Sequence, residues 1–393
     1  MNNRQLFLQH VAQTSAFPLA LEIERAEAMY IYDTDGKAYM DMIAGIGVSC
    51  LGHRHPNVIA AAKAQLDLYL HTIVYGEFVL APQVQLAKLL SDNLPTSLDS
   101  VYFVNSGTEA TEGAMKLAKR YTGRHEFVAC RNSYHGSTQG AMSLNSDDYF
   151  TSAYRPLLPN VKHINYDCEW CLQQITEATA AVVMETVAAE SGIYPPSEGY
   201  LKKVRARCDE VGALLILDEI QVGYGRTGTL WAFEQHGVVP DILLLAKGMG
   251  GGMPIGAFVA SREMMQCFAD NPLLGHITTF GGHPVCVAAA LATLQTLLSS
   301  NFIEEAKRKE LLFRELLVHE KIVTVRGVGL FLGIELSDFD FLQRVIQYCL
   351  KKGLITDWFL FNSKTMRLAP PLIITEDEIR AACSIILEAL DEV

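Results

Sequence analysis

The amino-acid sequence predicts an α/β protein that combines a large, mostly parallel β-sheet with a smaller α+β part. Short apolar runs such as Ala213–Leu217 and Ile242–Ala246 have the composition of strands that are buried on both faces. Runs of this kind alternate with helical patterns as far as Ser261, which is typical of a parallel sheet covered by helices on both faces. In the last third of the chain this alternation stops, and the change indicates a separate α+β part.

Composition limits the classes of function that the chain can serve. With 50% hydrophobic and 19% charged residues, the 393-residue chain is expected to form a compact globule. A formal net charge of −12 removes any general electrostatic case for a nucleic-acid or anionic-membrane partner. No apolar run is long enough for a transmembrane helix, and the N-terminus lacks the features of a signal peptide. Nine scattered cysteines predict reduced thiols and a cytoplasmic protein.

The first elements of the chain are predicted to be a helix, a hairpin and two further helices. Residues 1–20 form a helix followed by a loop, and Met29–Asp41 forms a hairpin around an Asp-Gly turn. Residues 45–56 form a glycine-rich loop, and helices follow at Pro56–Leu68 and Gln83–Leu94.

Two pairs of potential metal ligands occur in the chain, and neither predicts a metal site. His53 and His55 lie in the glycine-rich loop without a nearby carboxylate, so a structural role is favoured. Cys168 and Cys171 form a single CxxC pair that no second pair completes. No metal is therefore expected.

A strand at Val101–Val104 is followed by Ser106, Gly107 and Thr108 and then by a helix that runs to about Tyr121. A strand, a small polar loop and a helix N-terminus together form a cradle for an anion such as phosphate. An ordinary helix cap has the same sequence, so this pattern alone is weak evidence for phosphate.

Two further strands end in polar segments. The strand 126–130 leads into the loop 132–138, in which Tyr134 offers an aromatic ring suited to stacking on a flat cofactor. The buried strand Ala180–Met184 ends at Glu185, and Glu190 follows in a loop.

The strongest local signal is the pair formed by Asp218 and Lys247, each placed directly after a buried strand. Ligands of α/β sheets bind beyond the carboxyl ends of the strands, so both side chains are expected at the same edge. A lysine amine forms Schiff bases with aldehydes, and pyridoxal phosphate (PLP) enzymes combine such a lysine with an acid for the pyridine nitrogen. From these two residues alone, a structural ion pair is an equal alternative.

The last third of the chain is predicted to contain helices at 284–298, 302–318, 339–352 and from Glu376, with strands near 322–326 and 330–336. Arg367 interrupts apolar neighbours there. An arginine in such a position binds a carboxylate through two parallel hydrogen bonds, or forms a surface or interface salt bridge.

Together these segments resemble the class III aminotransferases, PLP enzymes of fold type I, and among them the acetylornithine and ornithine aminotransferase group. The motifs that carry the resemblance are NSGTEA at 105–110, YHG at 134–136, LDEIQVGYGRTG at 217–228, DILLLAKGMGGGMPIGA at 241–257, TFGGHP at 279–284 and MRLAPPL at 366–372. The implied domains are an N-terminal segment with part of a small domain (1–56), a large PLP-binding domain (57–290) and a C-terminal small domain (291–393).

The resemblance also implies how PLP is bound. Lys247 would form the Schiff base and move the proton during catalysis, and Asp218 would pair with the pyridine nitrogen. Gln221 would bond the phenolic oxygen, while Tyr134 and Ile220 would cover the two faces of the ring. Further implied cofactor-binding residues are Ser106, Gly107, Thr108, His135 and, from the neighbouring subunit of a homodimer, Thr279.

On the substrate side, Arg367 would bind the α-carboxylate of glutamate or 2-oxoglutarate, and Glu190 would shield it when another substrate is bound. The group usually has an arginine directly after the aromatic-x-Gly loop, whereas this chain has Ser137. The segment 185–190 also differs from the usual Glu-Pro-Val-Gln-Gly-Glu. Loss of a carboxylate clamp disfavours ornithine-type donors unless another cation replaces it.

The resulting hypothesis is a transaminase that moves an amino group from an ω-amine to 2-oxoglutarate, with acetylornithine, ornithine or a related acylated diamine as donor. The resemblance places such an enzyme in amino-acid metabolism, arginine biosynthesis included. The alternative is a PLP-dependent racemase, aminomutase or decarboxylase on the same scaffold. A nucleotide-binding protein is disfavoured, because Lys247 precedes the glycines and no phosphate-loop motif occurs.

Overall fold

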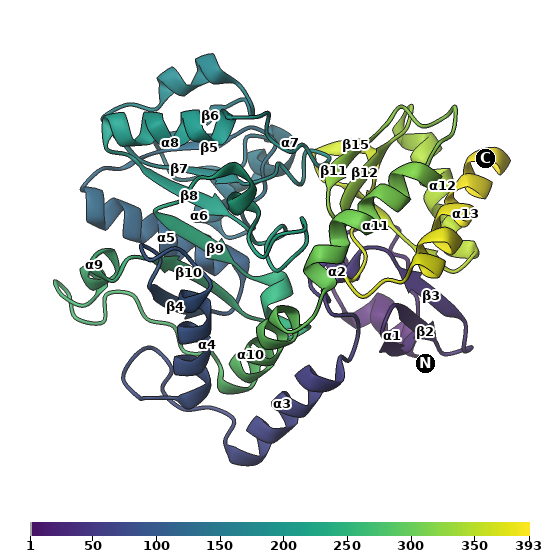
Figure 1. Cartoon of the computed structure of the whole chain (residues 1–393), viewed down its shortest axis with the longest axis horizontal. Coiled ribbons are helices and arrows are strands. Elements are labelled where there is room, and N and C mark those ends of the chain that lie inside the picture. The colour runs from purple at the N-terminus through teal and green to yellow at the C-terminus, as the bar shows by residue number, and fades with distance from the viewer. Residues whose placement is uncertain (1) are drawn as a thin grey trace.

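A seven-stranded sheet forms the centre of the computed structural model, which describes residues 2–393 (Figure 1). Its strand order is β4-β10-β9-β8-β7-β5-β6, and all neighbours from β9 to β6 are parallel, whereas β10 is antiparallel to both β4 and β9. The strands are β4 (Ser100–Val104), β5 (Glu126–Cys130), β6 (Val161–Ile164), β7 (Thr179–Glu185), β8 (Leu214–Asp218), β9 (Ile242–Leu245) and β10 (Gly256–Ala260). The predicted α/β class with a mostly parallel sheet is confirmed.

Both faces of this sheet are covered. In β8, Leu215 and Leu217 belong to one apolar cluster, whereas Leu214 and Ile216 belong to another, as expected for a strand whose side chains alternate between two buried faces. The helices around the sheet include α5 (Gly107–Thr122), α6 (Gln139–Met142), α7 (Asp148–Thr151), α8 (Tyr200–Val211) and α9 (Arg262–Met265). The continuous apolar runs in the sequence therefore mark strands with no solvent-exposed face.

A second sheet, with strand order β11-β12-β15-β14, is wholly antiparallel and lies in the C-terminal part of the chain. Long helices lie beside it (Figure 1), and their buried apolar residues belong to the same core cluster as those of the sheet. These elements are β11 (Thr324–Val328), β12 (Phe331–Glu335), β14 (Asp357–Phe359), β15 (Asn362–Leu368), α11 (Phe302–Leu316), α12 (Phe339–Lys351) and α13 (Glu376–Glu392).

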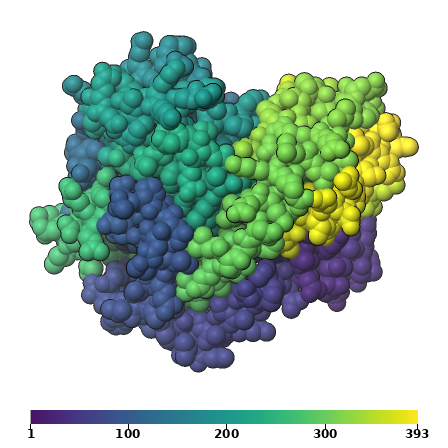
Figure 2. All heavy atoms as spheres, in the orientation of Figure 1, coloured from purple at the N-terminus to yellow at the C-terminus, as the bar shows by residue number. Residues whose placement is uncertain are grey.

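A third sheet joins the two ends of the chain. The hairpin strands β1 (Ile23–Glu27), β2 (Tyr30–Asp33) and β3 (Ala38–Asp41) are antiparallel, and β3 pairs with the distant β13 (Leu354–Ile355). The N-terminal helix α1 (Asn3–His10) lies beside this sheet (Figure 1). The N-terminal segment therefore packs with C-terminal elements. The space-filling view shows a notch between the part that holds the large sheet and the C-terminal part (Figure 2).

Helix α10 (Pro284–Leu298) packs against α3 (Pro56–Leu68) and α4 (Ala81–Asp92). It crosses residue 290, where the sequence places the end of the large domain, and the division into domains stays a prediction.

Most predicted elements agree with the structure to within a few residues. The N-terminal helix ends at His10 and is thus shorter than expected. Within residues 2–393, no single helix is long and apolar enough to cross a membrane, although the bent pair α10 and α11 passes that test together.

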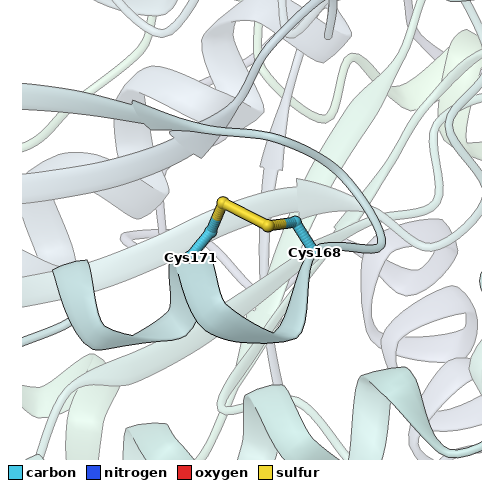
Figure 3. Close-up of a disulfide and its surroundings, with 2 residues drawn as sticks. All are labelled: Cys168 and Cys171. Atoms are coloured by element: carbon cyan, nitrogen blue, oxygen red, sulfur yellow. A yellow bond between two sulfur atoms is a disulfide. The ribbon is translucent and has the colours of Figure 1, made fainter.

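The expectation that all nine cysteines are free thiols is wrong for Cys168 and Cys171, which form a disulfide (Figure 3). Cys168 is the N-cap of the short 3-10 helix Glu169–Gln174 and Cys171 lies in its first turn, which brings their Cα atoms to 5.4 Å. That separation lies within the range that a disulfide spans. The number of cysteines alone does not reveal this local geometry. In the other candidate pair, His53 and His55, the expectation that no carboxylate lies nearby is wrong, because Nε2 of His53 lies 2.9 Å from Oδ2 of Asp41.

Candidate active site

A cavity of about 470 Å³ opens at the edge of the large sheet where β7, β8 and β9 end. Strand ends, the N-terminus of α5 and the loop after β5 all contribute to it, as expected for the ligand site of a parallel sheet. Its lining includes Val48, Ser106, Gly107, Thr108, Tyr134, His135, Ser137, Glu185, Asp218, Ile220, Gln221 and Lys247. Most residues that the sequence singled out thus surround one cavity.

Asp218 is the last residue of β8, and its carboxylate is buried and held at both oxygens. Its Oδ2 lies 2.7 Å from Nδ1 of the buried His135, and its Oδ1 accepts a hydrogen bond of 2.9 Å from the backbone N–H of Ile220. The Nε2 atom of His135 has no hydrogen-bond partner in residues 2–393. These contacts fix the orientation of the carboxylate while leaving acceptor capacity for a donor inside the cavity.

Lys247 follows β9 directly and begins the 3-10 turn Lys247–Gly250. Its backbone has φ +44°, a left-handed conformation that is costly for a residue with a side chain and that is concentrated at functional sites. Burial lowers the pKa of the Lys247 amine, and Arg367 lowers it further, while Glu190, Asp218 and Glu185 oppose the shift. The chain therefore places at the cavity an amine that loses its proton more readily than an exposed lysine.

The N-terminus of α5 forms the part of the cavity best suited to an anion. Ser106 is the N-cap residue, and Gly107 and Thr108 are the first two residues of the helix. The first N–H groups of a helix have no partner within it and carry the positive end of its dipole. A Cβ atom at Gly107 would approach Cδ1 of Ile220 to 2.8 Å, so a larger residue there would require the Ile220 side chain to move.

The loop after β5 packs onto the same helix terminus. The Thr108 and Thr138 hydroxyl oxygens lie 2.7 Å apart, and Gly136 approaches Thr108 with φ +135°. A Cβ atom at Gly136 would lie 2.2 Å from the Thr108 hydroxyl oxygen. Tyr134 is half-buried and Ser137 exposed, and both line the cavity.

Arg367 and Glu190 form a buried ion pair next to the cavity but outside its lining. Nη1 and Nη2 of Arg367 lie 3.1 and 3.2 Å from the two carboxylate oxygens of Glu190. Gln221, which lines the cavity, donates to Glu190 at 2.7 Å and accepts from Arg367 at 3.4 Å. Burial would raise the pKa of Glu190, but Arg367, Lys247 and the Gln221 hydrogen bond outweigh it and lower that pKa.

Glu185 is a polar residue of the cavity to which the sequence assigned no role. It ends β7 opposite Asp218, and its Oε2 accepts a 3.2 Å hydrogen bond from the Ala189 N–H. Burial, with the neighbouring Asp218 and Glu190 carboxylates, raises the pKa of Glu185 well above its usual range. The signal was present in the sequence, because Glu185 follows a buried strand in the same way as Asp218.

Thr279 is the predicted cofactor residue that the structure does not bring to the cavity of its own chain. It is exposed in the loop before α10, and the cavity lining does not include it. The contact of Thr279 with a cofactor in the neighbouring subunit therefore stays a prediction.

The remaining residues fit PLP. A buried lysine of lowered pKa, a fixed carboxylate and a helix N-terminus lie around one cavity, as an aldehyde, a ring nitrogen and a phosphate require. The individual roles of these residues stay predictions.

Comparison with known proteins gives matches over nearly the whole chain. Residues 11–390 match the family described as Aminotransferase class-III. An acetylornithine aminotransferase of Methanopyrus kandleri is 40% identical over 386 residues, which cover 97% of this chain and 96% of that protein. A putrescine aminotransferase of Pectobacterium atrosepticum is 40% identical over 366 residues, covering 88% of this chain and 77% of that protein. The ornithine aminotransferase of Toxoplasma gondii superposes with a TM-score of 0.91 at 30% identity, covering 99% and 93% of the two chains.

Proposed function

The chain belongs to the class III aminotransferases, PLP-dependent transaminases, and from this membership we propose that it moves an amino group from a terminal amine to 2-oxoglutarate, giving glutamate. The observation that carries this proposal is the buried pair of Arg367 and Glu190 beside the cavity. Such a pair gives one site two states, one with a free arginine for a dicarboxylate and one with a neutralised arginine for another substrate.

PLP would be held by Asp218, Tyr134, Ile220, Gln221 and the N-terminus of α5. When bound, PLP supplies an aldehyde that links to amines and a ring that withdraws electrons from the substrate Cα. Asp218, oriented by His135, would keep a proton on the ring nitrogen, because a buried carboxylate favours a charged donor beside it.

Lys247 would act as the acid–base group once substrate occupies the cavity. Burial lowers the pKa of its amine, so a larger fraction of the amine is neutral near pH 7 than in an exposed lysine. The neutral Lys247 amine would accept the proton from the substrate Cα, and the resulting ammonium group would give that proton up again to complete the transfer.

Arg367 would recognise the α-carboxylate of glutamate and 2-oxoglutarate after Glu190 has moved aside. An arginine binds a carboxylate through two parallel N–H donors, and Glu190 now occupies both of these donors. With Glu190 in place, the pair is electrically neutral, and an ω-amine donor without a carboxylate at that position can bind.

We propose a terminal amine as the donor, with a simple diamine ahead of ornithine and acetylornithine, because both of these amino acids carry a distal carboxylate. Ser137 lines the cavity where the acetylornithine and ornithine group has an arginine for the distal carboxylate of the donor. The acetylornithine and putrescine aminotransferases match this chain at the same 40% identity, which supports both donor types. The proposed assembly is a homodimer in which Thr279 serves the neighbouring site.

The test is a half-reaction screen on the purified holoenzyme. The visible absorbance of bound PLP is followed while glutamate, acetylornithine, ornithine and putrescine are added one at a time. We expect glutamate and at least one terminal amine to bleach the band. Failure with glutamate would contradict the 2-oxoglutarate side, and failure with every terminal amine would contradict the ω-amine donor.

A further inference from the structure

Arg367 has a second carboxylate neighbour, which lies at a different edge of its guanidinium group from Glu190. In the antiparallel pair formed by β14 and β15, Asp357 is the register partner of Arg367. Its Oδ1 lies 3.1 Å from Nε of Arg367, which is the distance of an ion pair, although the two atoms are not aligned for a hydrogen bond. The arginine side chain is only 3% exposed and that of Asp357 24%, so this ion pair is largely removed from water.

The contacts of Arg367 divide into a fixed set and a movable set. Asp357, the ring of Phe359 at 4.4 Å and the carbonyl oxygen of Trp358 at 3.3 Å all belong to β14, the strand next to Arg367. Glu190, by contrast, lies in a loop that follows β7 of the large sheet. If the Glu190 loop moves, the contacts from β14 remain, together with the 3.4 Å hydrogen bond from Arg367 to Gln221, and among these Asp357 is the carboxylate.

We propose that Asp357 is a positioning residue for the dicarboxylate substrate, acting as the permanent counterion that keeps the Arg367 guanidinium paired and oriented when Glu190 leaves. This inference rests on the proposed use of Arg367 for glutamate and 2-oxoglutarate. The two acids that contact Arg367 then have different roles. Glu190 competes with the substrate carboxylate for Arg367, and Asp357 does not.

The physical reason is the cost of an unpaired buried charge. Removing one partner of a buried ion pair is strongly destabilising, because the remaining charge has lost both water and its counterion. Without Asp357, the state in which Glu190 has moved aside would contain a guanidinium with neutral hydrogen-bond partners but no carboxylate counterion, and this state would be less populated. A dicarboxylate that must capture this state would then bind more slowly.

The orientation of the Arg367 guanidinium also supports this role of Asp357. Asp357 contacts Nε, which leaves Nη1 and Nη2 on the edge that Glu190 now occupies. That edge is the one that a substrate carboxylate needs for two parallel hydrogen bonds. Asp357 and Phe359 together therefore hold the arginine in the conformation that substrate requires.

The experiment compares Asp357→Asn, which keeps the size of the side chain but removes its charge, with Asp357→Glu, which keeps the charge. Both half-reactions are measured on the holoenzyme, one with glutamate or 2-oxoglutarate and one with the terminal amine that the wild type uses. Glu335→Gln is the matched control, because Glu335 pairs with Arg326 in the same sheet and does not contact Arg367.

We expect Asp357→Asn to lower kcat/KM for glutamate and 2-oxoglutarate about tenfold and to change kcat/KM for the amine less than about twofold. Asp357→Glu should restore most of the loss, and Glu335→Gln should affect both substrates equally or neither. An equal loss in both half-reactions, or none in either, would overturn the assignment for a folded variant. A wild type that does not react with glutamate would instead refute the proposed function, and the role of Asp357 with it.

Discussion

Lys247 combines two features that are unfavourable for folding and useful for chemistry. Its amine is buried with a lowered pKa, and its backbone has φ +44°. Each feature costs the folded state free energy, on the order of 1 kcal/mol or more for the backbone alone. A residue that keeps both is better explained by the reaction than by stability.

Replacing Lys247 by Ala is expected to lower turnover at least about a thousandfold, because the variant loses both the covalent partner of PLP and the proton carrier. The measurement is the steady-state rate with the amine identified in the half-reaction screen. Lys309→Met is the control, since Lys309 is also a lysine inside the folded chain but bonds to Leu372 and Glu305 outside the cavity. Residual activity of more than a few per cent in Lys247→Ala would contradict the assigned role.

Asp357 makes the stability of the folded protein depend on pH, and replacing Asp357 removes this dependence. Burial raises the pKa of Asp357 to about 6 from 3.8, with Glu190 and Asp41 adding to the shift and Arg367 opposing it. The folded state thus holds this proton more tightly than the unfolded chain. The protonated Asp357 carboxyl therefore stabilises the folded state by about 3 kcal/mol below pH 3.8. This stabilisation falls as the pH rises from 3.8 and is lost as the pH passes through about 6.

For Asp357→Asn, which cannot ionise, we therefore expect a melting temperature that rises relative to the wild type between pH 4 and pH 7. Thermal unfolding of both proteins across this range, in one buffer series, measures the difference. A difference that stays constant with pH would show that the Asp357 carboxyl does not titrate there. A variant more stable yet less active towards dicarboxylates would mean that the carboxylate is kept for function at the expense of stability.

The N-terminus of α5 packs closely against Gly136, a glycine outside this helix. Gly136 has φ +135°, and a Cβ atom there would lie 2.2 Å from the Thr108 hydroxyl oxygen. Gly136→Ala must therefore displace the first turn of α5 or the loop that carries Tyr134. Because both would contact PLP, we expect the variant to bind PLP at least about tenfold more weakly.

Equilibrium titration of the apoenzyme with PLP, followed by absorbance, measures this change. Gly123→Ala is the control at the other end of the same helix, where φ is +69° and a Cβ atom would have no other atom within 4 Å. That variant carries backbone strain without a collision. Equal PLP affinity in the two variants would contradict the role assigned to the packing of Gly136 on Thr108.

The disulfide between Cys168 and Cys171 is expected to contribute little to stability. It closes a loop of only a few residues, and the chain-entropy gain from so short a loop is about 2 kcal/mol. Spread over a chain of 393 residues, this corresponds to a melting-temperature shift of less than about 3 °C. The double replacement Cys168→Ser with Cys171→Ser, and wild type treated with dithiothreitol, should both melt within that margin and keep wild-type kinetics. A larger loss in either would assign the disulfide a greater role.

The sequence predicted strands and site residues well where one local rule decides them. Asp218 and Lys247 follow continuous apolar runs, and in the structure these runs are adjacent parallel strands whose ends meet at one edge. Residues 44–47 escaped prediction, because Ala44, Gly45, Ile46 and Gly47 all have positive φ in a left-handed turn that contacts the segment after Lys247. A β-branched residue such as Ile46 disfavours that conformation, so tertiary contacts must enforce it.

The contact between Asp357 and Arg367 escaped prediction for a related reason. The two residues are ten positions apart, and they meet only because β14 and β15 pair in one register. The short strand β14 has no clear alternation in the sequence. Partners of a charged residue across a sheet depend on register, which a single sequence specifies only weakly for strands of this length.

At the scale of the whole molecule, the position of Thr279 bears on how many chains build one site. Thr279 is exposed and does not line the cavity of its own chain, although the resemblance to class III aminotransferases assigns it to the phosphate. Apolar side chains near it are also exposed, among them Leu273 at 76% and Phe280 at 54%. Large apolar residues that remain exposed in a cluster favour an interface with another protein surface.

A mixing experiment with two impaired variants decides whether Thr279 acts in a neighbouring subunit. The Lys247→Ala variant lacks the lysine but keeps Thr279, whereas the Thr279→Ala variant keeps the lysine but lacks the threonine. Activity is measured at limiting PLP, so that loss of the threonine lowers it. If each site takes Lys247 from one subunit and Thr279 from the other, a mixed dimer has one site with both residues and one with neither. Random reassembly should then restore about a quarter of the wild-type activity, since half of the dimers are mixed and half of their sites are complete. If Thr279 serves its own chain, every site in the mixed dimer keeps one defect, and mixing restores nothing.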